Sequence, residues 1–372
     1  MVVPGICIDC SPLLVRSAGV KTWLYHWLRA LREQHPKRIQ TLFEPSAGRL
    51  DHAGGLRLHG PRLVQLQTLN LLPSGVLDLL TRHAGVFHAS NLLRTVPKRP
   101  RLSTTLHDLT AWIVPEFHRP EQVAGDLAFA ERVLRHADGV IAVSENTRRD
   151  AIRIFGMKPE KIRVIYPGAG FGYFSVTEEQ KVDAANTYGL RLPYFLFIGT
   201  IEPRKNIDTL LTAWMQLPST FRSENNLVVL GMPGWKSGKT LRRLTQLTRE
   251  PSGVRYMGYV PESFVPGLTA GAEALIYPSF YEGFGIPVAQ AMAAGCPVIA
   301  SNVASLPEIT GGAALLIDPR SPGEITNALR RVKESPGLGD QLRLAGLERA
   351  RLFTWDRAAR ESLEYFAALM SS

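Results

Sequence analysis

Short apolar runs rich in β-branched and aromatic residues alternate with helix-like periodicity along nearly the whole chain. Such alternation is the pattern of a parallel β-sheet with helices on both faces, and it predicts the α/β class. In the first half we expect strands near 2–8, 39–43, 86–90, 102–107, 139–144 and 162–166, with helices near 20–33, 120–136 and 146–155. In the second half we expect strands near 194–200, 226–231, 254–260, 272–279, 297–301 and 314–318, with helices near 206–216, 239–248, 288–295, 322–333, 338–352 and 355–370.

The length of 372 residues exceeds what one ordinary hydrophobic core accommodates and fits two domains of medium size. Residues 168–193 are less apolar and precede a fresh strand, so we expect the domain junction there. The expected domains are 1–175 and 176–350, each a doubly wound, Rossmann-like sheet, followed by a last helix in 351–372. Residues 45–75 have weaker periodicity and are expected to be loop with short helical pieces.

The composition excludes several classes of protein. An apolar fraction of 45% with 20% charged residues is typical of a globular chain. No run approaches the ~18 uninterrupted apolar residues of a membrane-spanning helix. The first residues, MVVPGICIDC, lack a basic stretch ahead of an apolar one, so they predict a strand and not a signal peptide. We therefore expect a cytoplasmic protein, or one on the cytosolic side of a membrane.

Two of the three cysteines, Cys7 and Cys10, have the C-x-x-C spacing of thioredoxin-like redox motifs. A redox pair should open a helix, where the helix dipole lowers the pKa of the first thiol. Cys7 instead lies in the expected first strand, and Ser11-Pro12 follow without a helical pattern. We favour buried or loop cysteines over redox function, and we expect Cys296 to be a small core residue.

The net charge of +10 is unevenly placed. Residues 1–101 contain 14 Lys or Arg and 5 Asp or Glu and so carry +9, and the segment RTVPKRPR at 94–101 holds four basic residues. Any one of these arginines is most simply a solvated loop residue. The excess of positive charge over the whole of residues 1–101 predicts an anionic partner such as lipid head groups or a lipid diphosphate. Nucleic acid ranks last, because no zinc-finger spacing, aromatic RNA-binding run or helix-turn-helix signal accompanies the charge.

The run YEGFGIPVAQ at 281–290 follows an expected strand and opens a helix of small residues. Two glycines let the backbone turn tightly, and Pro287 has the backbone angle suited to a first helical position. The amide groups of this turn are expected to point outward at the positive end of a helix dipole, which makes an anion site, most naturally for a phosphate. The residues assigned to this turn are Gly283, Phe284, Gly285 and Ile286.

Two side chains flank the turn. Glu282 is expected on the lip of the anion site, and Gln290 about one turn into the helix. A phosphate cradle beside hydroxyl-binding side chains suits a nucleotide sugar better than a bare nucleotide. The segment YEGFGIPVAQAMAAGCPVIAS resembles the donor-site signature of the family 4 retaining glycosyltransferases, which have the GT-B architecture.

In that family, two glutamates separated by seven residues mark the nucleotide-sugar site. This chain has Glu282 at the first position, to which the resemblance assigns a catalytic role in contact with the sugar hydroxyls, and Gln290 at the second. The family's second Glu holds the ribose hydroxyls of the donor. An amide still accepts from one hydroxyl and donates to another, but it lacks the strength of a charge-assisted bond, about a factor of two. The substitution therefore bears on donor affinity more than on the chemistry.

A second motif follows the first strand of the second half. Arg204 and Lys205 lie at its end, and Asn206 is expected to cap the next helix. Positioned cations stabilise the charge that develops on a diphosphate leaving group. An Arg-Lys pair before a helix is, taken alone, usually exposed to solvent. The segment GTIEPRKN, however, resembles the family's donor-phosphate motif, especially in bacterial enzymes that use GDP-mannose. Gly199 and Val260, at the ends of two strands, are also assigned to donor binding.

The resemblance also implies a cleft between the two domains, with the acceptor on the first domain, the donor mainly on the second, and the last helix returning to the first. The family has a histidine that contacts the donor sugar, and we carry this catalytic role to His107. The alternative is a core histidine bonded to Asp108, which otherwise orients the loop. Gly19 and Lys21 resemble the family's glycine loop, although the family usually has a small residue in place of Lys21. The sequence leaves two roles open for Lys21: it contacts a phosphate, or it only covers the loop.

No Asp-x-Asp pair and no His/Cys cluster with zinc spacing occurs in the sequence. We therefore expect no metal and no cofactor, with the anion turn and the two cations acting on the diphosphate instead. Residues 234–240 resemble a phosphate-binding P-loop, but Pro233 occupies its first glycine position and no Walker-type Asp follows. Residues 168–172, GAGFG, open no helix and are expected to be a hinge rather than a dinucleotide site.

The resemblance implies a retaining hexosyltransferase, with mannose favoured as the sugar and GDP-mannose favoured over UDP-sugars. Double displacement would need a carboxylate nucleophile beneath the anomeric carbon. Glu282 is the strong acidic candidate and in the family binds sugar hydroxyls, so we favour front-face displacement.

The basic first domain predicts a lipid-linked glycan acceptor at the cytosolic membrane face, in cell-surface polysaccharide synthesis. A degenerate sugar-nucleotide-binding protein, suggested by Gln290, and a sugar-nucleotide epimerase of similar architecture are the alternatives.

Overall fold

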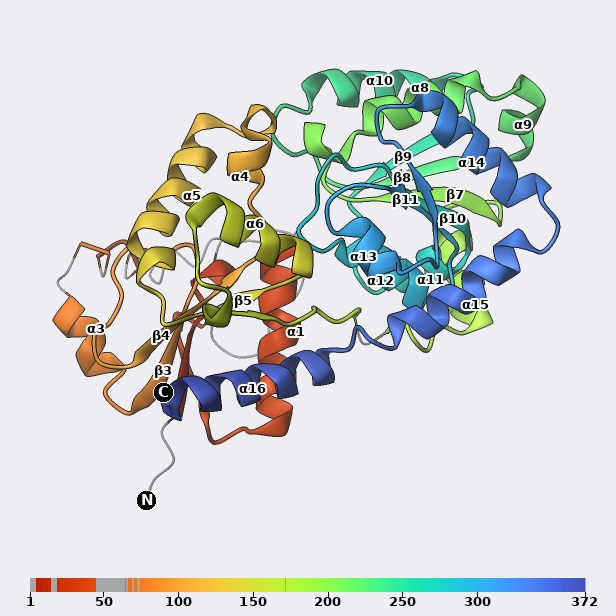
Figure 1. The fold of residues 1–372 in the computed structure, drawn as a ribbon. Coiled ribbons are helices and arrows are strands. Elements are labelled where there is room, and N and C mark those ends of the chain that lie inside the picture. Colours follow the sequence, from red (N-terminus) through yellow and green to blue (C-terminus); the bar gives the residue numbers. More distant parts are fainter. Residues whose placement is uncertain are drawn as a thin grey trace. The chain divides into compact units, whose positions relative to one another are not determined.

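The structure is a computed structural model that describes residues 5–14, 19–44, 64, 66–68, 70–71, 74–170 and 172–371. These residues form two compact units (Figure 1). The first comprises the described part of Met1–Gly168 and Trp355–Ser372, and the second comprises the described part of Ala169–Thr354. The sequence predicts divisions at 175/176 and 350/351. In the structure they lie at 168/169 and 354/355. The amide of Ala169 donates to the carbonyl of Phe353 at 2.9 Å, which joins the two ends of the second unit.

Each unit is built on a six-stranded parallel sheet, and most strand residues are buried because a parallel sheet is covered on both faces. The first sheet has the order β2-β1-β3-β4-β5-β6, with β1 (Gly5–Asp9), β2 (Ile39–Leu42), β3 (Ala84–Ala89), β4 (Arg101–Leu106), β5 (Gly139–Ala142) and β6 (Ile162–Val164). The second has the order β12-β11-β10-β7-β8-β9, with β7 (Tyr194–Ile198), β8 (Leu227–Leu230), β9 (Val254–Gly258), β10 (Ala272–Tyr277), β11 (Val298–Ser301) and β12 (Leu315–Ile317). The predicted α/β class with two doubly wound sheets is confirmed.

Helices connect the strands in both units. Those of the first unit are α1 (Gly19–Gln34), α3 (Ser74–Leu80), α4 (Thr110–Ile113), α5 (Pro120–Arg132), α6 (Glu145–Phe155) and α16 (Trp355–Ser371). Those of the second unit are α7 (Glu178–Thr187), α8 (Ile207–Gln216), α9 (Ser219–Glu224), α10 (Gly238–Arg249), α11 (Val265–Ala270), α12 (Ile286–Ala293), α13 (Leu306–Thr310), α14 (Pro322–Glu334) and α15 (Leu338–Ala350).

Several elements differ from the sequence prediction. The helix expected at 120–136 ends at Arg132 and is followed by a 3-10 turn, and a short 3-10 helix at Ser11–Leu14 follows Cys10 where no helical pattern was seen. Helix α7 lies inside the expected junction, because Thr177 and Gln180 cap it reciprocally through their side chains and backbone amides. Most of the stretch expected to be loop, and the residues before Gly5, lie outside the described residues.

The last helix packs within the first unit. Figure 1 shows α16, at the blue end of the chain, beside α1. The buried indole of Trp27 donates to the Ser362 hydroxyl at 2.9 Å, and Gln34 donates to the Asp356 carbonyl at 2.8 Å. Burial of both Trp27 and Phe366 in this contact ties the end of the chain to its beginning.

Gly231, after β8, lies against Gly199, after β7. A Cβ at Gly231 would lie 1.8 Å from the Gly199 carbonyl oxygen, a backbone atom that moves only with the sheet. We expect Gly231→Ala to lower the free energy of unfolding by about 3 kcal/mol through overpacking. Gly238→Ala is the control, since the nearest atom to its Cβ would be 3.7 Å away on the Arg242 side chain. Urea unfolding followed by circular dichroism measures both, and equal stabilities of the two variants would contradict the prediction.

Candidate functional site

The second unit brings the ends of β7 and β10 together. From β7 the chain runs outward through β8 and β9, then crosses to β10 on the other side of β7. The strand order therefore reverses between β7 and β10, and in a doubly wound sheet ligands bind at such a point, outside the carboxyl ends of the strands. The loops that leave these two ends contain the GTIEPRKN and YEGFGIPVAQ segments.

Hydrogen bonds join the two loops. The amide of Phe280 donates to the Arg204 carbonyl at 2.9 Å, and the side-chain amide of Asn206 donates to the carbonyls of Pro278 and Pro319 at 2.9 and 2.6 Å. The expected helix-capping role of Asn206 is wrong: its side chain accepts no bond from α8, because its backbone is left-handed with φ 58° instead of the extended conformation of a capping residue. Asn206 holds the loops together instead.

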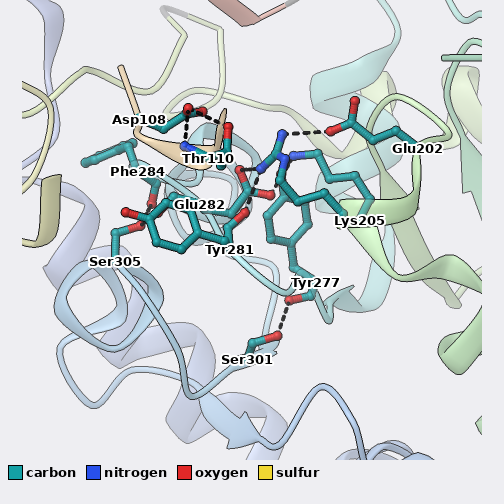
Figure 2. A network of polar contacts seen from close by, with 11 residues as sticks. Asp108, Thr110, Glu202, Lys205, Tyr277, Tyr281, Glu282, Phe284, Ser301 and Ser305 are labelled. Carbon is teal, nitrogen blue, oxygen red and sulfur yellow. Dashed lines mark hydrogen bonds and ion pairs between the residues drawn. The ribbon is translucent and has the colours of Figure 1, made fainter. Parts of the chain in front are cut away.

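Lys205 and Glu282 form a buried ion pair at this junction (Figure 2). The Lys205 Nζ lies 2.6 Å from Glu282 Oε1, and the two side chains are only 10% and 8% exposed. The same Nζ donates to the Tyr277 hydroxyl at 2.5 Å and lies 4.8 Å from the centre of the Tyr277 ring. Lys205 is therefore held by a carboxylate and a phenol together.

Arg204 completes the cluster. Its Nη1 lies 2.8 Å from Glu282 Oε2 and donates to the Tyr281 carbonyl at 2.6 Å. Its Nη2 donates to Glu202 Oε1 at 2.7 Å, and the Glu202 side chain is 2% exposed. Glu282 thus has one oxygen on each cation, and Glu202 orients the guanidinium from the other side.

The charges in the cluster support one another. Burial opposes ionisation of Glu282, but the charges of Arg204 and Lys205 outweigh it and lower its pKa to about 2. Burial likewise opposes the charge on Lys205, yet the Glu282 carboxylate raises the pKa of this ammonium above its ordinary value. The pKa of Glu202 is raised by burial, against the opposing effect of Arg204. At neutral pH, Lys205 and Glu282 are therefore both ionised.

The predicted positions of these side chains need correction. Glu282 was expected on the lip of the anion site, but only 6% of the residue is exposed. Arg204 and Lys205 lie at the predicted strand end, yet they face Glu282 rather than open solvent. The physical reason is that two cations so close together in a buried loop need a counter-charge, and Glu282 on the neighbouring strand end supplies it.

Contacts of Ser305 and Phe353 hold the glycine turn in place. The buried Ser305 hydroxyl donates to the carbonyls of Glu282 and Phe284 at 2.9 and 3.0 Å, and the Phe284 ring packs edge-on against Phe353. Gly285 is left-handed with φ 96°, and α12 begins at the next residue.

The turn is more buried than expected. Pro287 takes the second helical position and not the first, and Gly283, Phe284 and Gly285 are buried. Among the described backbone bonds, none is donated by the amides of Gly285 or Ile286. These two donors are therefore suited to an anion.

Three further residues that the sequence assigns to donor binding lie at different places relative to the cluster. Gly199 lies beside Lys205, since a Cβ on Gly199 would be 3.7 Å from Lys205 Cε. Gln290 lies in α12, partly buried, one turn beyond the glycine turn. Val260 follows β9, which β8 separates from β7, and no described contact joins it to the cluster.

In the first unit, His107 follows β4 and is partly buried. Its ring meets Trp23 edge-on with centroids 4.7 Å apart, and burial lowers its pKa to about 4, so the imidazole is neutral at neutral pH. Asp108 accepts from the amide and hydroxyl of Thr110 at 3.1 and 2.7 Å. Within the described residues no hydrogen bond joins Asp108 to His107, so Asp108 shapes the loop before α4.

Gly19 begins α1, and nothing described lies within 4 Å of a Cβ placed there. Lys21 is 8% exposed, and burial lowers the pKa of its ammonium. Cys7 and Cys10 are buried free thiols, and burial raises the pKa of Cys7 to about 12, the opposite of what a redox cysteine needs. These thiols are core groups of the first unit.

Three residues of the cluster were missed by the sequence analysis: Glu202, Tyr277 and Ser305. Glu202 lies two positions before Arg204, and a carboxylate so close to two cations was a usable signal. Tyr277 ends β10 and Ser305 precedes α13, and nothing in the local pattern distinguishes them from core residues.

Among the described residues, no group of three His, Cys, Asp or Glu side chains is arranged to hold a metal ion. The described helices also include none with the length and apolar character needed to cross a bilayer.

Comparison with known proteins links both units to enzymes of sugar transfer. Residues 17–169 match the profile of Glycosyltransferase Family 4, and residues 180–349 match that of Glycosyl transferases group 1. The O-antigen chain mannosyltransferase B of Escherichia coli is 32% identical over 286 residues, which cover 76% of this chain and 74% of the relative.

Solved structures show the same fold. Sucrose-phosphate synthase from Thermosynechococcus elongatus superposes with a TM-score of 0.75 at 22% identity, covering 99% of this chain and 100% of that one. HepE from Anabaena, in complex with UDP and glucose, superposes with a TM-score of 0.72 at 17% identity, covering 98% of this chain and 100% of that one.

Proposed function

Because the chain belongs to family 4 of the glycosyltransferases and has their two-domain GT-B fold, we propose that it is a retaining hexosyltransferase that uses a nucleotide-sugar donor. Mannose is the proposed sugar and GDP-mannose the proposed donor, in preference to UDP-sugars. The proposed acceptor is a hydroxyl of a lipid-linked glycan in cell-surface polysaccharide synthesis. Support for the sugar and the pathway comes from the similarity to the O-antigen chain mannosyltransferase of Escherichia coli.

The observation that carries the proposal is the buried cluster at the reversal of strand order. Arg204 and Lys205 together hold one carboxylate, Glu282, through both of its oxygens. A diphosphate presents the same kind of oxygens with more charge. We propose that the donor diphosphate replaces Glu282 on the two cations and that the released carboxylate accepts hydrogen bonds from the sugar hydroxyls. Glu202 keeps the Arg204 guanidinium in place during the exchange.

The proposed reaction is a front-face displacement. The bond from the anomeric carbon to the diphosphate oxygen breaks, the acceptor hydroxyl attacks on the same face, and a phosphate oxygen of the leaving group takes its proton. Arg204, Lys205 and the amides of Gly285 and Ile286 stabilise the charge that develops on the diphosphate. The neutral His107 donates to the sugar in this scheme. Independence of metal and cofactor is part of the proposal.

A screen of donors tests the proposed function. Purified protein is incubated with GDP-mannose, UDP-glucose and UDP-galactose, each with and without lipid-linked and free mannose acceptors, and in the presence and absence of EDTA. We expect release of GDP that depends on an acceptor, and an α-linked product whose anomeric configuration, read by NMR, matches the donor. Binding without turnover would overturn the proposal in favour of a degenerate sugar-nucleotide-binding protein, and conversion of the sugar without acceptor would favour an epimerase.

Gln290 is proposed to bind the donor ribose. Gln290→Glu should preserve or tighten nucleotide binding, because a carboxylate makes charge-assisted bonds to both hydroxyls. Gln290→Leu should weaken binding by about 1–3 kcal/mol, because it leaves ribose hydroxyls without a partner. Calorimetry with GDP and with UDP measures both variants and identifies the preferred base. Equal affinities of the leucine variant and the unchanged protein would refute the assignment.

A further inference from the structure

The first unit presents an exposed apolar stripe on α3. Val76, Leu79 and Leu80 are 37%, 61% and 49% exposed, and their spacing of three and four residues places them on one face of the helix. Leu77, between them, is 1% exposed and holds the helix on the core. Leu71, shortly before the helix, is 86% exposed. Four large apolar side chains therefore face solvent within ten residues of chain.

The basic segment near residue 94 is hydrogen-bonded to this same stretch. The Asp78 carboxylate, also on α3, accepts from the amides of Lys98 and Arg99 at 2.7 and 3.0 Å. The Asn70 side chain accepts from the amide of Arg94 at 2.8 Å, next to Leu71. The backbone that carries three exposed cations is thus tied to the apolar stretch at both of its ends.

We call these residues, which the hydrogen bonds of Asp78 and Asn70 bring near one another, the α3 surface. Its apolar members are Leu71, Val76, Leu79 and Leu80, and its basic members are Arg94, Lys98 and Arg99, all seven of them exposed.

We propose that the α3 surface docks the protein on an anionic lipid bilayer. The apolar side chains enter the boundary between head groups and acyl chains, and the three cations contact the anionic head groups beside them. A nucleic acid would use the cations but leave the leucines exposed. The charge on residues 1–101 of +9 supplies the complementarity to a negative surface. This docking places the first unit at the surface where a lipid-linked acceptor resides, and it does not depend on the proposed reaction.

Sedimentation with vesicles tests the proposal without any substrate. The full chain is mixed with vesicles of phosphatidylcholine alone and with vesicles that contain 30% phosphatidylglycerol, at low and at high salt. We expect binding to the anionic vesicles at low salt, weakened by salt as screening predicts, and little binding to the neutral ones. Equal binding to both kinds of vesicle, or none at low salt, would overturn the proposal.

Variants separate the two halves of the surface. Arg94→Ser, Lys98→Ser and Arg99→Ser combined should weaken binding about a hundredfold, since each cation near an anionic surface adds roughly a fivefold factor. Leu79→Ser with Leu80→Ser should weaken vesicle binding at least about tenfold, because two leucine side chains no longer enter the bilayer.

Matched controls decide whether the effects belong to this surface. The charge control removes three exposed cations elsewhere, Lys158, Arg242 and Arg249, and the apolar control is Leu344→Ser, at a leucine 69% exposed on α15. Both controls should bind vesicles like the unchanged protein. If the charge control loses as much binding as the α3 variants, attachment reflects net charge alone and the proposed surface is wrong. Thermal unfolding of every variant shows that the fold is retained.

Discussion

Lys205→Ala should lower kcat/KM for sugar transfer by about 10²–10³, the scale for loss of one donor that stabilises developing negative charge. Lys205 is a buried cation of the cluster, shared between Glu282 and Tyr277. It lies in the loop that leaves β7, where the strand order reverses. Removal takes away the point charge proposed to meet the diphosphate when its bond to the sugar breaks. Steady-state kinetics with the donor identified by the screen measures the effect.

The same change also disturbs a buried ion pair, which costs about 3–5 kcal/mol of unfolding free energy when one partner is lost. Urea unfolding therefore accompanies the kinetics, and activity is referred to the folded fraction. Lys239→Ala, an exposed lysine on α10 of the same unit, is the matched control and should leave both quantities unchanged. Lys205→Arg keeps the charge and should retain most of the stability. Near-normal kcat/KM in folded Lys205→Ala would remove this lysine from the proposed diphosphate site.

Glu282→Gln should abolish much of the pH dependence of stability in acid. The folded-state pKa of Glu282 is about 2, below the ordinary 4.5 of a glutamate, so its carboxylate stabilises the fold above pH 4.5 and this contribution is lost as pH falls toward 2. The difference between the two pKa values corresponds to about 3 kcal/mol at neutral pH. The variant should therefore be less stable at pH 7 by at least about that amount, because Arg204 and Lys205 lose their shared counter-charge. Near pH 2 it should approach the unchanged protein.

Unfolding in urea at pH 7, pH 4 and pH 2.5 measures this prediction. Glu334→Gln is the control, because Glu334 pairs with Arg330 on the surface of α14 and is 49% exposed. Removal of such a surface pair should change stability by less than about 1 kcal/mol at every pH. Parallel stability curves for Glu282→Gln and the unchanged protein would show that the carboxylate is not held by the two cations.

Much of the second unit follows from local sequence. The apolar strands at 194–200 and 272–279 and the helix after the glycine turn were expected within a few residues of β7, β10 and α12. Strand patterns and glycine-proline turns depend on neighbours in the chain, so they can be predicted from the sequence without knowledge of the fold. The same holds for the cations after β7 and the glutamate after β10, whose positions at strand ends put them at the ligand-binding edge of the sheet.

The partners of these side chains were decided only by tertiary structure. Glu282 meets Arg204 and Lys205 because β10 lies next to β7 in the sheet, although the strands are far apart in the chain. The sequence predicts a carboxylate on the lip of the anion site and two cations that project from a strand end. The adjacency of the strand ends instead makes a buried cluster in which these charges pair, together with Glu202 and Tyr277.

The same distinction applies to the first unit. The sequence by itself determined that the excess positive charge belongs to residues 1–101 and that the chain builds two doubly wound sheets, because composition and periodicity are properties of the chain. Only the tertiary structure decided that the basic segment is hydrogen-bonded to Asp78 of α3 and to Asn70 before it. Hydrogen bonds between segments twenty or more residues apart depend on the tertiary fold, and no local sequence pattern predicts them.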